Sequence, residues 1–415
     1  MLKHFSIGLI LVFGLQQNDS LKSQSFSNYN TSNSDLPENY TWCIAKHPSG
    51  AIYVGTDYGL AIFNNDEIAV FNSQNSGLTS NSVRSIFIDA DGRVWIGTFT
   101  GGLFIFDGLD WTNLNTQNSE LPDDFIRVVA KDSSGMYWIG TGNGLVKFDG
   151  EQVLQVYDEF NSPLESRNIS AITVNAQNVK IIGTINGGLT YIDGEDFTVY
   201  VSYNSALPDN TITDFDFDEQ QRPIFAMPDG GVAIHQGGNN FTWYSPIVVS
   251  SMPTKAIECI QYLGAGSFYA GSMNKGLLIR NSNGSWQSYN TQNSAIASDW
   301  IRDLVVDEQG RVWMATAMSG VSVFDPSLPQ GFINQTDSYF VNMDQRNRKL
   351  SVKSNKPISK IEVYDKLGRK HMLQSMQNSK EGIIDIDKLH GVSYFVVVLY
   401  FTDGSSKALR PSVAP

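Results

Sequence analysis

The sequence contains few of the residues that most catalytic and metal sites require. Its 415 residues include only two cysteines and five histidines. HExxH, C-x-x-C, G-x-S-x-G and glycine-rich phosphate loops are all missing. These motifs carry zinc sites, redox dithiols, nucleophilic serines and nucleotide phosphates. We therefore expect a non-catalytic chain with no cofactor and no metal.

Positive charge and long apolar runs are scarce as well. The net charge is −13, and charged residues make up 17% of the chain. An acidic body repels phosphates, so nucleic acid is not an expected partner. No apolar run after the N-terminus approaches the ~20 residues of a membrane helix. Aromatics at 12% and 36 glycines instead favour short strands joined by tight turns.

The N-terminus has the pattern of an export signal. Lys3 and His4 precede an apolar segment, Phe5–Leu15, which is too short to span a bilayer. We expect residues 1–23 to be a signal peptide, with the mature chain beginning near Gln24 and carrying no transmembrane anchor. A buried first strand or helix is the alternative.

One stretch of sequence recurs seven times. It contains an "IGT"-like element whose small residue recurs every 42 to 45 residues, at Gly55, Gly97, Gly140, Gly183, Ala226, Gly271 and Ala315. In the best copy, apolar alternation over 83–89 and 93–98 flanks the turn Asp91-Gly92, and two more strand-like segments follow at 103–106 and 111–115. Four short strands per unit are typical of a β-propeller blade. A flat solenoid is the alternative.

The two ends of this repeat array complement each other. The seventh unit ends near Asp325 without a fourth strand, and Phe26–Leu36 matches the missing motif. We therefore predict a seven-bladed β-propeller over residues 24–325, with residues 24–31 as the outer strand of the last blade.

The repeats resemble the two-component regulator propeller family. The second unit matches that family's pattern at Leu78, Val83-Arg84, Ile86, Asp89, Gly92, Trp95-Ile96-Gly97-Thr98, Gly101-Gly102-Leu103 and Phe106-Asp107-Gly108. Such propellers are typically extracytoplasmic sensor regions, often fused to a histidine kinase. The resemblance therefore implies a ligand-binding sensor, although no kinase core is recognisable in this chain.

The C-terminal part differs from the repeats. After a predicted linker, residues 326–344, the chain becomes basic over residues 345–415. Its strand-like segments, separated by turns, are 349–354, 359–364, 382–386, 394–401 and 405–409. This pattern predicts a small β-sandwich. Ile361–Arg369, Ile384–Val396 and Asp403-Gly404 resemble the C-terminal sorting domain of the type IX secretion system of Bacteroidetes. The resemblance implies that the secretion machinery is a partner and that the protein is secreted or surface-attached via the periplasm. An ordinary binding sandwich is the alternative.

A candidate ligand site lies at the mouth of the predicted channel. The residue thirteen positions before each anchor falls near the start of the channel-lining strand: Trp42, Arg84, Arg127, Ser170, Thr213, Glu258 and Arg302. Loops at the same rim add Tyr58, Phe99, Asn143, Asn186, Met273 and Trp300. Three arginines with aromatic neighbours would suit an anionic or polyhydroxylated ligand, such as a glycan or peptide. The alternative is that the arginines only cap strands or pair with Asp123, Asp124, Asp299 and Asp303.

Several other patterns have competing interpretations. A propeller lyase or glycoside hydrolase would need paired carboxylates at the axis, and these positions supply one acid, Glu258. The Asp89–Gly92 segment resembles the start of a calcium loop but is better explained as a hairpin turn. Trp95, Trp138 and Trp313 suit packing between blades better than sugar stacking. Cys43 and Cys259 fall on non-adjacent blades, so we expect two free, buried thiols.

Overall fold

The computed structural model describes residues 26–64, 67–327, 339–344, 349–365, 370–385, 395–401 and 406–409. The described residues form strands and turns and contain no helix, so the predicted all-β class is confirmed. The chain divides into two compact units, which are treated separately below. The larger unit comprises Ser27–Thr291 and Ile296–Phe324, and the other contains Asp325–Pro415. The predicted signal peptide lies outside the described residues.

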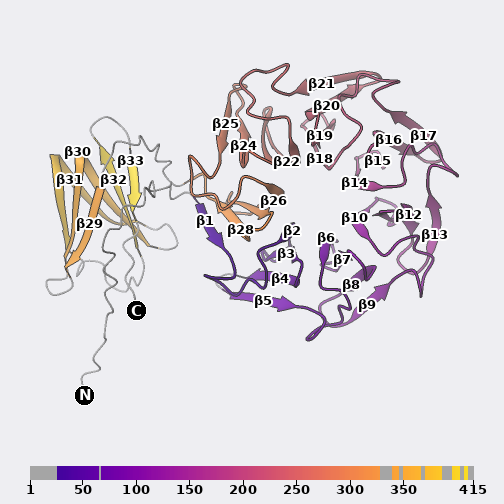
Figure 1. The fold of residues 1–415 in the computed structure, drawn as a ribbon, viewed down its shortest axis with the longest axis horizontal. Coiled ribbons are helices and arrows are strands. Elements are labelled where there is room, and N and C mark those ends of the chain that lie inside the picture. The colour runs from indigo at the N-terminus through magenta and orange to yellow at the C-terminus, as the bar shows by residue number, and fades with distance from the viewer. Residues whose placement is uncertain are drawn as a thin grey trace. The chain divides into compact units, whose positions relative to one another are not determined.

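The larger unit is a ring of seven four-stranded sheets (Figure 1). The first three are β2–β5 (Thr41–Lys46, Ile52–Thr56, Gly59–Asn64, Glu67–Phe71), β6–β9 (Val83–Ile88, Val94–Thr98, Leu103–Phe106, Trp111–Leu114) and β10–β13 (Ile126–Lys131, Tyr137–Thr141, Gly144–Phe148, Val153–Tyr157). The next three are β14–β17 (Ile169–Val174, Lys180–Thr184, Leu189–Asp193, Asp196–Tyr200), β18–β21 (Asp214–Phe217, Pro223–Met227, Gly231–Gly237, Asn240–Tyr244) and β22–β25 (Ile257–Gly264, Ser267–Ser272, Leu277–Arg280, Trp286–Tyr289). The seventh combines β26–β28 (Ile301–Val306, Val312–Thr316, Val321–Phe324) with β1 (Phe26–Tyr29). This count agrees with the predicted seven blades.

Strand β1 lies beside β28 as the outer strand of the seventh sheet. Its Tyr29 ring stacks on Trp313 of β27 with centroids 5.9 Å apart, and meets Phe63 of β4 edge-on at 5.3 Å. The first and last parts of the ring sequence thus share one apolar cluster, which includes Val54, Phe63 and Trp313. Strand β1, which supplies the motif that the seventh repeat lacks in sequence, thus completes the seventh sheet in the structure.

The anchor glycines recur because neighbouring sheets approach closely at that point. A Cβ added to Gly140 of β11 would lie 2.6 Å from Val128 Cγ1 and 2.7 Å from Ile169 Cγ2. Ile169 begins β14, the first strand of the next sheet. Real Cβ atoms do not approach side chains this closely, so glycine is required at this position of the third sheet, whereas the fifth and seventh sheets carry Ala226 and Ala315 there.

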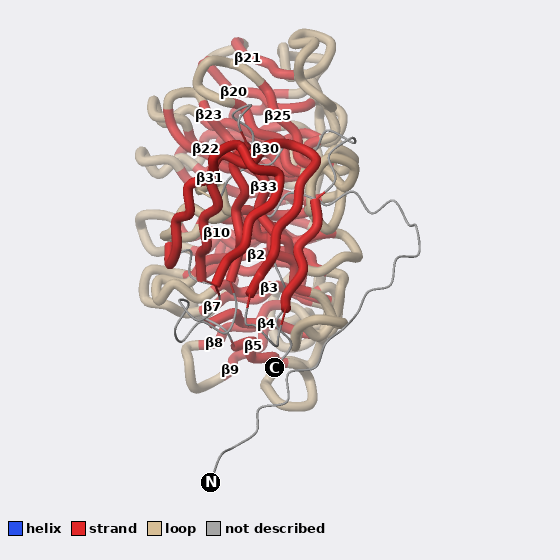
Figure 2. The backbone as a smooth tube through the Cα atoms, turned by 90° about the vertical axis from the view of Figure 1, so that its left-hand side faces the viewer, coloured by secondary structure: helices blue, strands red, loops and turns tan. Residues whose placement is uncertain are grey.

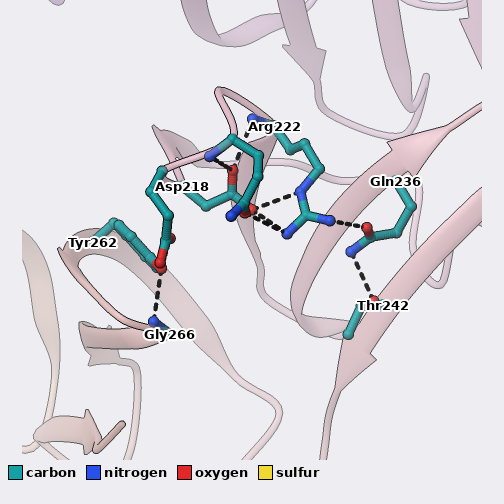
Figure 3. Close-up of polar contacts among 8 residues, drawn as sticks. Asp218, Arg222, Gln236, Thr242, Tyr262 and Gly266 are labelled. Carbon is teal, nitrogen blue, oxygen red and sulfur yellow. Dashed lines mark hydrogen bonds and ion pairs between the residues drawn. The ribbon is translucent and has the colours of Figure 1, made fainter.

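The hairpin between the first and second strands is held by a carboxylate at its base. In β18–β19, Asp218 Oδ1 accepts the backbone N–H groups of Gln220 and Arg222 at 3.0 and 2.9 Å (Figure 3). Arg222 Nε donates to Asp218 Oδ2 at 2.7 Å, and its guanidinium also reaches Gln236. In β6–β7, Asp89 Oδ1 accepts the N–H groups of Asp91 and Arg93, both at 3.0 Å. The Asp89 carboxylate therefore serves the predicted turn.

The recurring tryptophans pack between blades, as predicted. Trp95, Trp138 and Trp313 are at most 5% exposed, so none can stack on a ligand. The Trp95 ring stacks on Tyr137 of the next sheet at 3.9 Å. Trp138 Nε1 donates to Asp132 at 3.0 Å and Trp313 Nε1 to Asp307 at 2.8 Å.

Both cysteines are free and buried, as predicted. Cys43 lies on β2 and Cys259 on β22, and the sheet of β26–β28 follows β22–β25 in the ring before β2 is reached (Figure 1). Burial raises the pKa of each thiol well above its usual value. These thiols are therefore core residues of low reactivity.

The C-terminal unit contains one five-stranded antiparallel sheet, seen face-on in Figure 2. Its strands are β29 (Tyr339–Asp344), β30 (Lys349–Asp365), β31 (Lys370–Asp385), β32 (Phe395–Phe401) and β33 (Ser406–Leu409). Strand β30 pairs with β29, β31 and β32, so the described ladders form a single network, and the sandwich stays a prediction. Two segments predicted as separate strands, 349–354 and 359–364, belong to this one long strand. Strand β29 occupies the last six residues of the predicted linker.

Candidate functional site

A β-bulge sets the orientation of the candidate site residues. In six of the seven sheets, the register of the first strand skips one residue near its start. The skipped residues are Trp42, Arg84, Arg127, Ser170, Glu258 and Arg302. A bulge leaves its extra residue unpaired and re-aims the side chain. These first strands surround the centre of the ring (Figure 1), and bulged residues of different sheets contact one another, as Trp42 does with Arg84 and Arg302.

Trp42 lies between two arginines. The Cζ of Arg84 is 3.4 Å from the centroid of the Trp42 ring, and the Cζ of Arg302 is 3.7 Å from it. Arg302 also stacks on Trp300 at 4.4 Å. Each such contact contributes about 0.5–2 kcal/mol, depending on its solvent exposure. The first, second and seventh sheets thereby supply one continuous stack.

The stack continues into the third sheet. Arg84 lies 5.2 Å from the Phe99 ring, Phe99 meets Phe125 edge-on at 4.9 Å, and Arg127 covers Phe125 at 4.3 Å. The sequence predicted every member except Phe125, which lies one residue before the start of β10. The complete row, called here the arginine–aromatic ladder, consists of Trp300, Arg302, Trp42, Arg84, Phe99, Phe125 and Arg127.

Only one of the three arginines has an ion-pair partner within the described residues. Arg84 Nη2 lies 3.1 Å from Asp57 Oδ1, and Asp57 also accepts a 2.7 Å hydrogen bond from Ser82. Asp57 was not singled out from the sequence, because it lies in the loop after β3, away from the anchored positions.

The four acids expected to pair with the arginines do not do so in the described residues. They accept backbone N–H groups instead: Asp123 from Phe125, Asp124 from Thr116, Asp299 from Thr291, and Asp303 from Ile44 and Leu304. The arginines are thus held by aromatic rings rather than by these carboxylates.

Arg127 and Arg302 keep unused hydrogen-bond donors. Among described residues, the Nε–H of each is enclosed without an acceptor, and neither side chain has a hydrogen-bond or ion-pair partner. Their Nη groups are not among the enclosed atoms without a partner, so these groups keep some solvent access. Burial lowers the pKa of both, while Asp123 and Glu258 act in the opposite direction on Arg127 and Arg302 respectively. The fixed guanidinium groups are therefore ready to donate to an acceptor.

Several of the remaining candidate residues are polar and already have hydrogen-bond partners. Ser170 donates to Ile212 O at 2.5 Å and Thr213 to Ala226 O at 3.3 Å, so neither hydroxyl is available as a donor. At the rim, Asn143 donates to Pro122 O at 3.3 Å. Tyr58 and Phe99 are each 47% exposed. The contacts among the candidate residues are therefore not spread around the whole ring. They lie on the seventh, first, second and third sheets.

Two carboxylates lie one residue after the bulge positions: Asp303, which the sequence analysis considered only as an arginine partner, and Asp214, which it did not single out. Asp303 of β26 accepts the N–H of Ile44 in the next sheet at 2.8 Å, and Asp214 of β18 likewise accepts that of Ile260. Burial raises the pKa of Asp303 to about 7 and moves that of Asp214 in the same direction. Burial also raises the pKa of Glu258, against the effect of Arg302. Both aspartates lie twelve residues before their anchors, as Cys43 and Cys259 do. This shared repeat position could have indicated that their side chains are buried.

Comparison with known proteins supports the fold. The model of the two component regulator propeller family matches residues 77–100. No curated protein matches the sequence. Among the described residues, no helix long and apolar enough to cross a membrane is found.

Solved structures with similar folds include an extracellular domain, a secretion-system component and a lyase. One is the extracellular domain of a putative hybrid two component system from B. thetaiotaomicron, at 17% identity and TM-score 0.64, covering 93% of this chain and 57% of that one. PorZ, a surface component of the type-IX secretion system of Porphyromonas gingivalis, has 14% identity and TM-score 0.51, covering 97% and 60%. Virginiamycin B lyase from Staphylococcus aureus has 15% identity and TM-score 0.56, covering 72% and 98%. This chain thus spans just over half of the first of these structures, and at such identities the likenesses show the β-propeller fold alone.

Proposed function

We propose that the protein is an extracytoplasmic, non-catalytic recognition module that binds a ligand at the channel mouth. The observation that carries this proposal is the arginine–aromatic ladder, in which stacking fixes three guanidinium groups while two of them lack polar partners. Pre-organised donors of this kind bind ligands with little loss of side-chain entropy. The extracellular setting of the similar sensor domain supports the location.

A catalytic role is less well supported by the two mouth carboxylates. Asp57 is engaged by Arg84 and Ser82, and Glu258 lies within the electrostatic reach of Arg302. Acid–base cleavage of a glycosidic bond needs two carboxyl groups placed on opposite sides of the bond. We therefore propose binding, and not lysis or hydrolysis, as the working activity.

The binding proposal can be tested with an array of immobilised oligosaccharides and peptides. The full chain and the rim variant Phe99→Ala would be applied at equal concentration, with Leu109→Ala as the matched control, because Leu109 is 88% exposed on an outer loop. We expect a defined set of probes to retain the wild type and the control at least tenfold better than Phe99→Ala. Failure to retain any probe, or equal retention of all three proteins, would contradict the proposal.

We further propose that the C-terminal unit directs export through the type IX machinery. Support comes from the sorting-domain resemblance of Ile361–Arg369 and Ile384–Val396. Because β29 belongs to the same sheet as β30, the whole unit is removed only by truncation before Tyr339.

Deleting residues 328–415 should therefore abolish release without unfolding the propeller. We expect the truncated protein to accumulate in the periplasm with an unchanged melting temperature. Immunoblots of culture medium, cell surface and periplasm would measure this distribution. Release of the truncated protein at the wild-type level would exclude the sorting role.

A further inference from the structure

The three arginines of the ladder are not equivalent. Arg84 is enclosed between Trp42 and Phe99 and is neutralised by Asp57, with Nη2 and Oδ1 3.1 Å apart. Its side chain is only 15% exposed. Arg84 therefore has little freedom to meet a ligand, and its contacts are those of a residue that holds the ladder together.

Arg127 and Arg302 differ from Arg84 because neither has an ion-pair partner among the described residues. Arg127 packs on the Phe125 ring at 4.3 Å, and Arg302 contacts the rings of Trp42 at 3.7 Å and Trp300 at 4.4 Å. Neither has a hydrogen bond or an ion pair within the described residues, and their Nη groups keep some solvent access. A stacked guanidinium with a free Nη edge presents two parallel N–H donors, the geometry that matches a carboxylate.

Electrostatics favour an anion over a neutral acceptor. The charge on Arg84 is disfavoured by both Arg302 and Arg127, so Arg84 lies within electrostatic reach of each of them. Asp57 pairs with Arg84, while Glu258 and Asp123 are not in ion-pair contact with the other two. A bound carboxylate would reduce the mutual repulsion and satisfy donors that are otherwise unused.

We propose that the channel mouth binds a small acidic ligand whose carboxylate pairs with Arg302 or Arg127, with Arg84 as a positioning residue. This inference rests on the proposed recognition function and specifies its ligand class. The exposed rings of Tyr58 and Phe99 supply the neighbouring apolar contact for the body of the ligand. A sugar acid and a free peptide C-terminus both carry the required group.

The test compares acids with their own amides. Small sugar acids and N-acetylated tripeptides, each paired with its carboxamide, would be titrated into the full chain by calorimetry. At least one acid should bind saturably while its amide binds at least tenfold more weakly. Whether sugar or peptide acids bind would identify the source of the carboxylate. Absence of binding by every acid, or equal binding of acid and amide, would overturn the proposal.

Variants separate the binding role from the positioning role. At least one of the variants Arg302→Gln and Arg127→Gln should weaken acid binding at least tenfold with little change in melting temperature. Arg84→Gln should instead lower the melting temperature. Arg167→Gln is the control, because Arg167 lies outside the ladder, is half exposed and pairs with Glu159. Unchanged affinity in Arg302→Gln and Arg127→Gln would overturn the assignment. Array binding of neutral probes alone would leave the recognition function intact but refute the carboxylate.

Discussion

Deletion of residues 24–31 is expected to lower the melting temperature by roughly 10 °C or more, in a single cooperative transition. The deletion removes β1 from the seventh sheet, exposes the edge of β28 and uncovers Trp313, on which Tyr29 stacks. It also removes Phe26, which is 6% exposed. Loss of one buried aromatic side chain typically costs about 3–5 kcal/mol. Calorimetry of the deletion variant would measure the shift.

Point variants separate the ring contacts of β1 from its chain length. Tyr29→Phe keeps the stacking on Trp313 and the edge contact with Phe63, so its melting temperature should stay near that of the wild type. Tyr29→Ala should lose a large part of what the deletion loses. An unchanged transition in the deletion variant would show that β1 does not close the ring.

The free energy of unfolding is expected to fall as the pH rises from about 4 to about 7. Burial raises the pKa of Asp303 to about 7 in the folded protein, against ~3.9 in an unfolded chain. Between these values the folded state holds one proton more than the unfolded state, so raising the pH favours unfolding. At 1.36 kcal/mol per unit, the contribution of Asp303 to this loss is at most about 4 kcal/mol.

Asp303→Asn should flatten this pH dependence, whatever its effect on stability at any one pH. Asparagine does not titrate, although it has one acceptor for the two N–H groups, of Ile44 and Leu304, that Asp303 accepts. The exposed Glu308 on the adjacent hairpin gives the control Glu308→Gln, which should leave the slope intact. Urea unfolding at several pH values would measure these slopes. Equal slopes in the wild type and Asp303→Asn would contradict the role assigned to Asp303.

Much of the propeller could be predicted because its constraints repeat. The anchor glycines, Gly140 among them, recur because the next sheet leaves no room for a Cβ. Asp89 and Asp218 recur because the hairpin backbone needs their oxygens as hydrogen-bond acceptors. The C-terminal unit has no internal repeat, which is why the strand β29 and the continuity of β30 were not predicted.

The sequence predicted which residues form the candidate site, but it did not predict how they are arranged. Fixed spacing identified Trp42, Arg84, Arg127 and Arg302, yet it could not reveal the bulges that turn them to the channel. Asp57 was missed because it lies in the loop after β3, whereas Arg84 lies on β6 of the next sheet. Contacts between blades depend on the closed ring, and spacing along the chain does not encode them.

The most direct test of the central claim is the structure of a complex with the ligand that the array and the titrations identify. The account predicts the ligand at the channel mouth, beside Tyr58 and Phe99, with an acidic group within hydrogen-bond distance of the Nη atoms of Arg302 or Arg127. A ligand bound at the outer edge of the blades, with the arginine–aromatic ladder unoccupied, would contradict it.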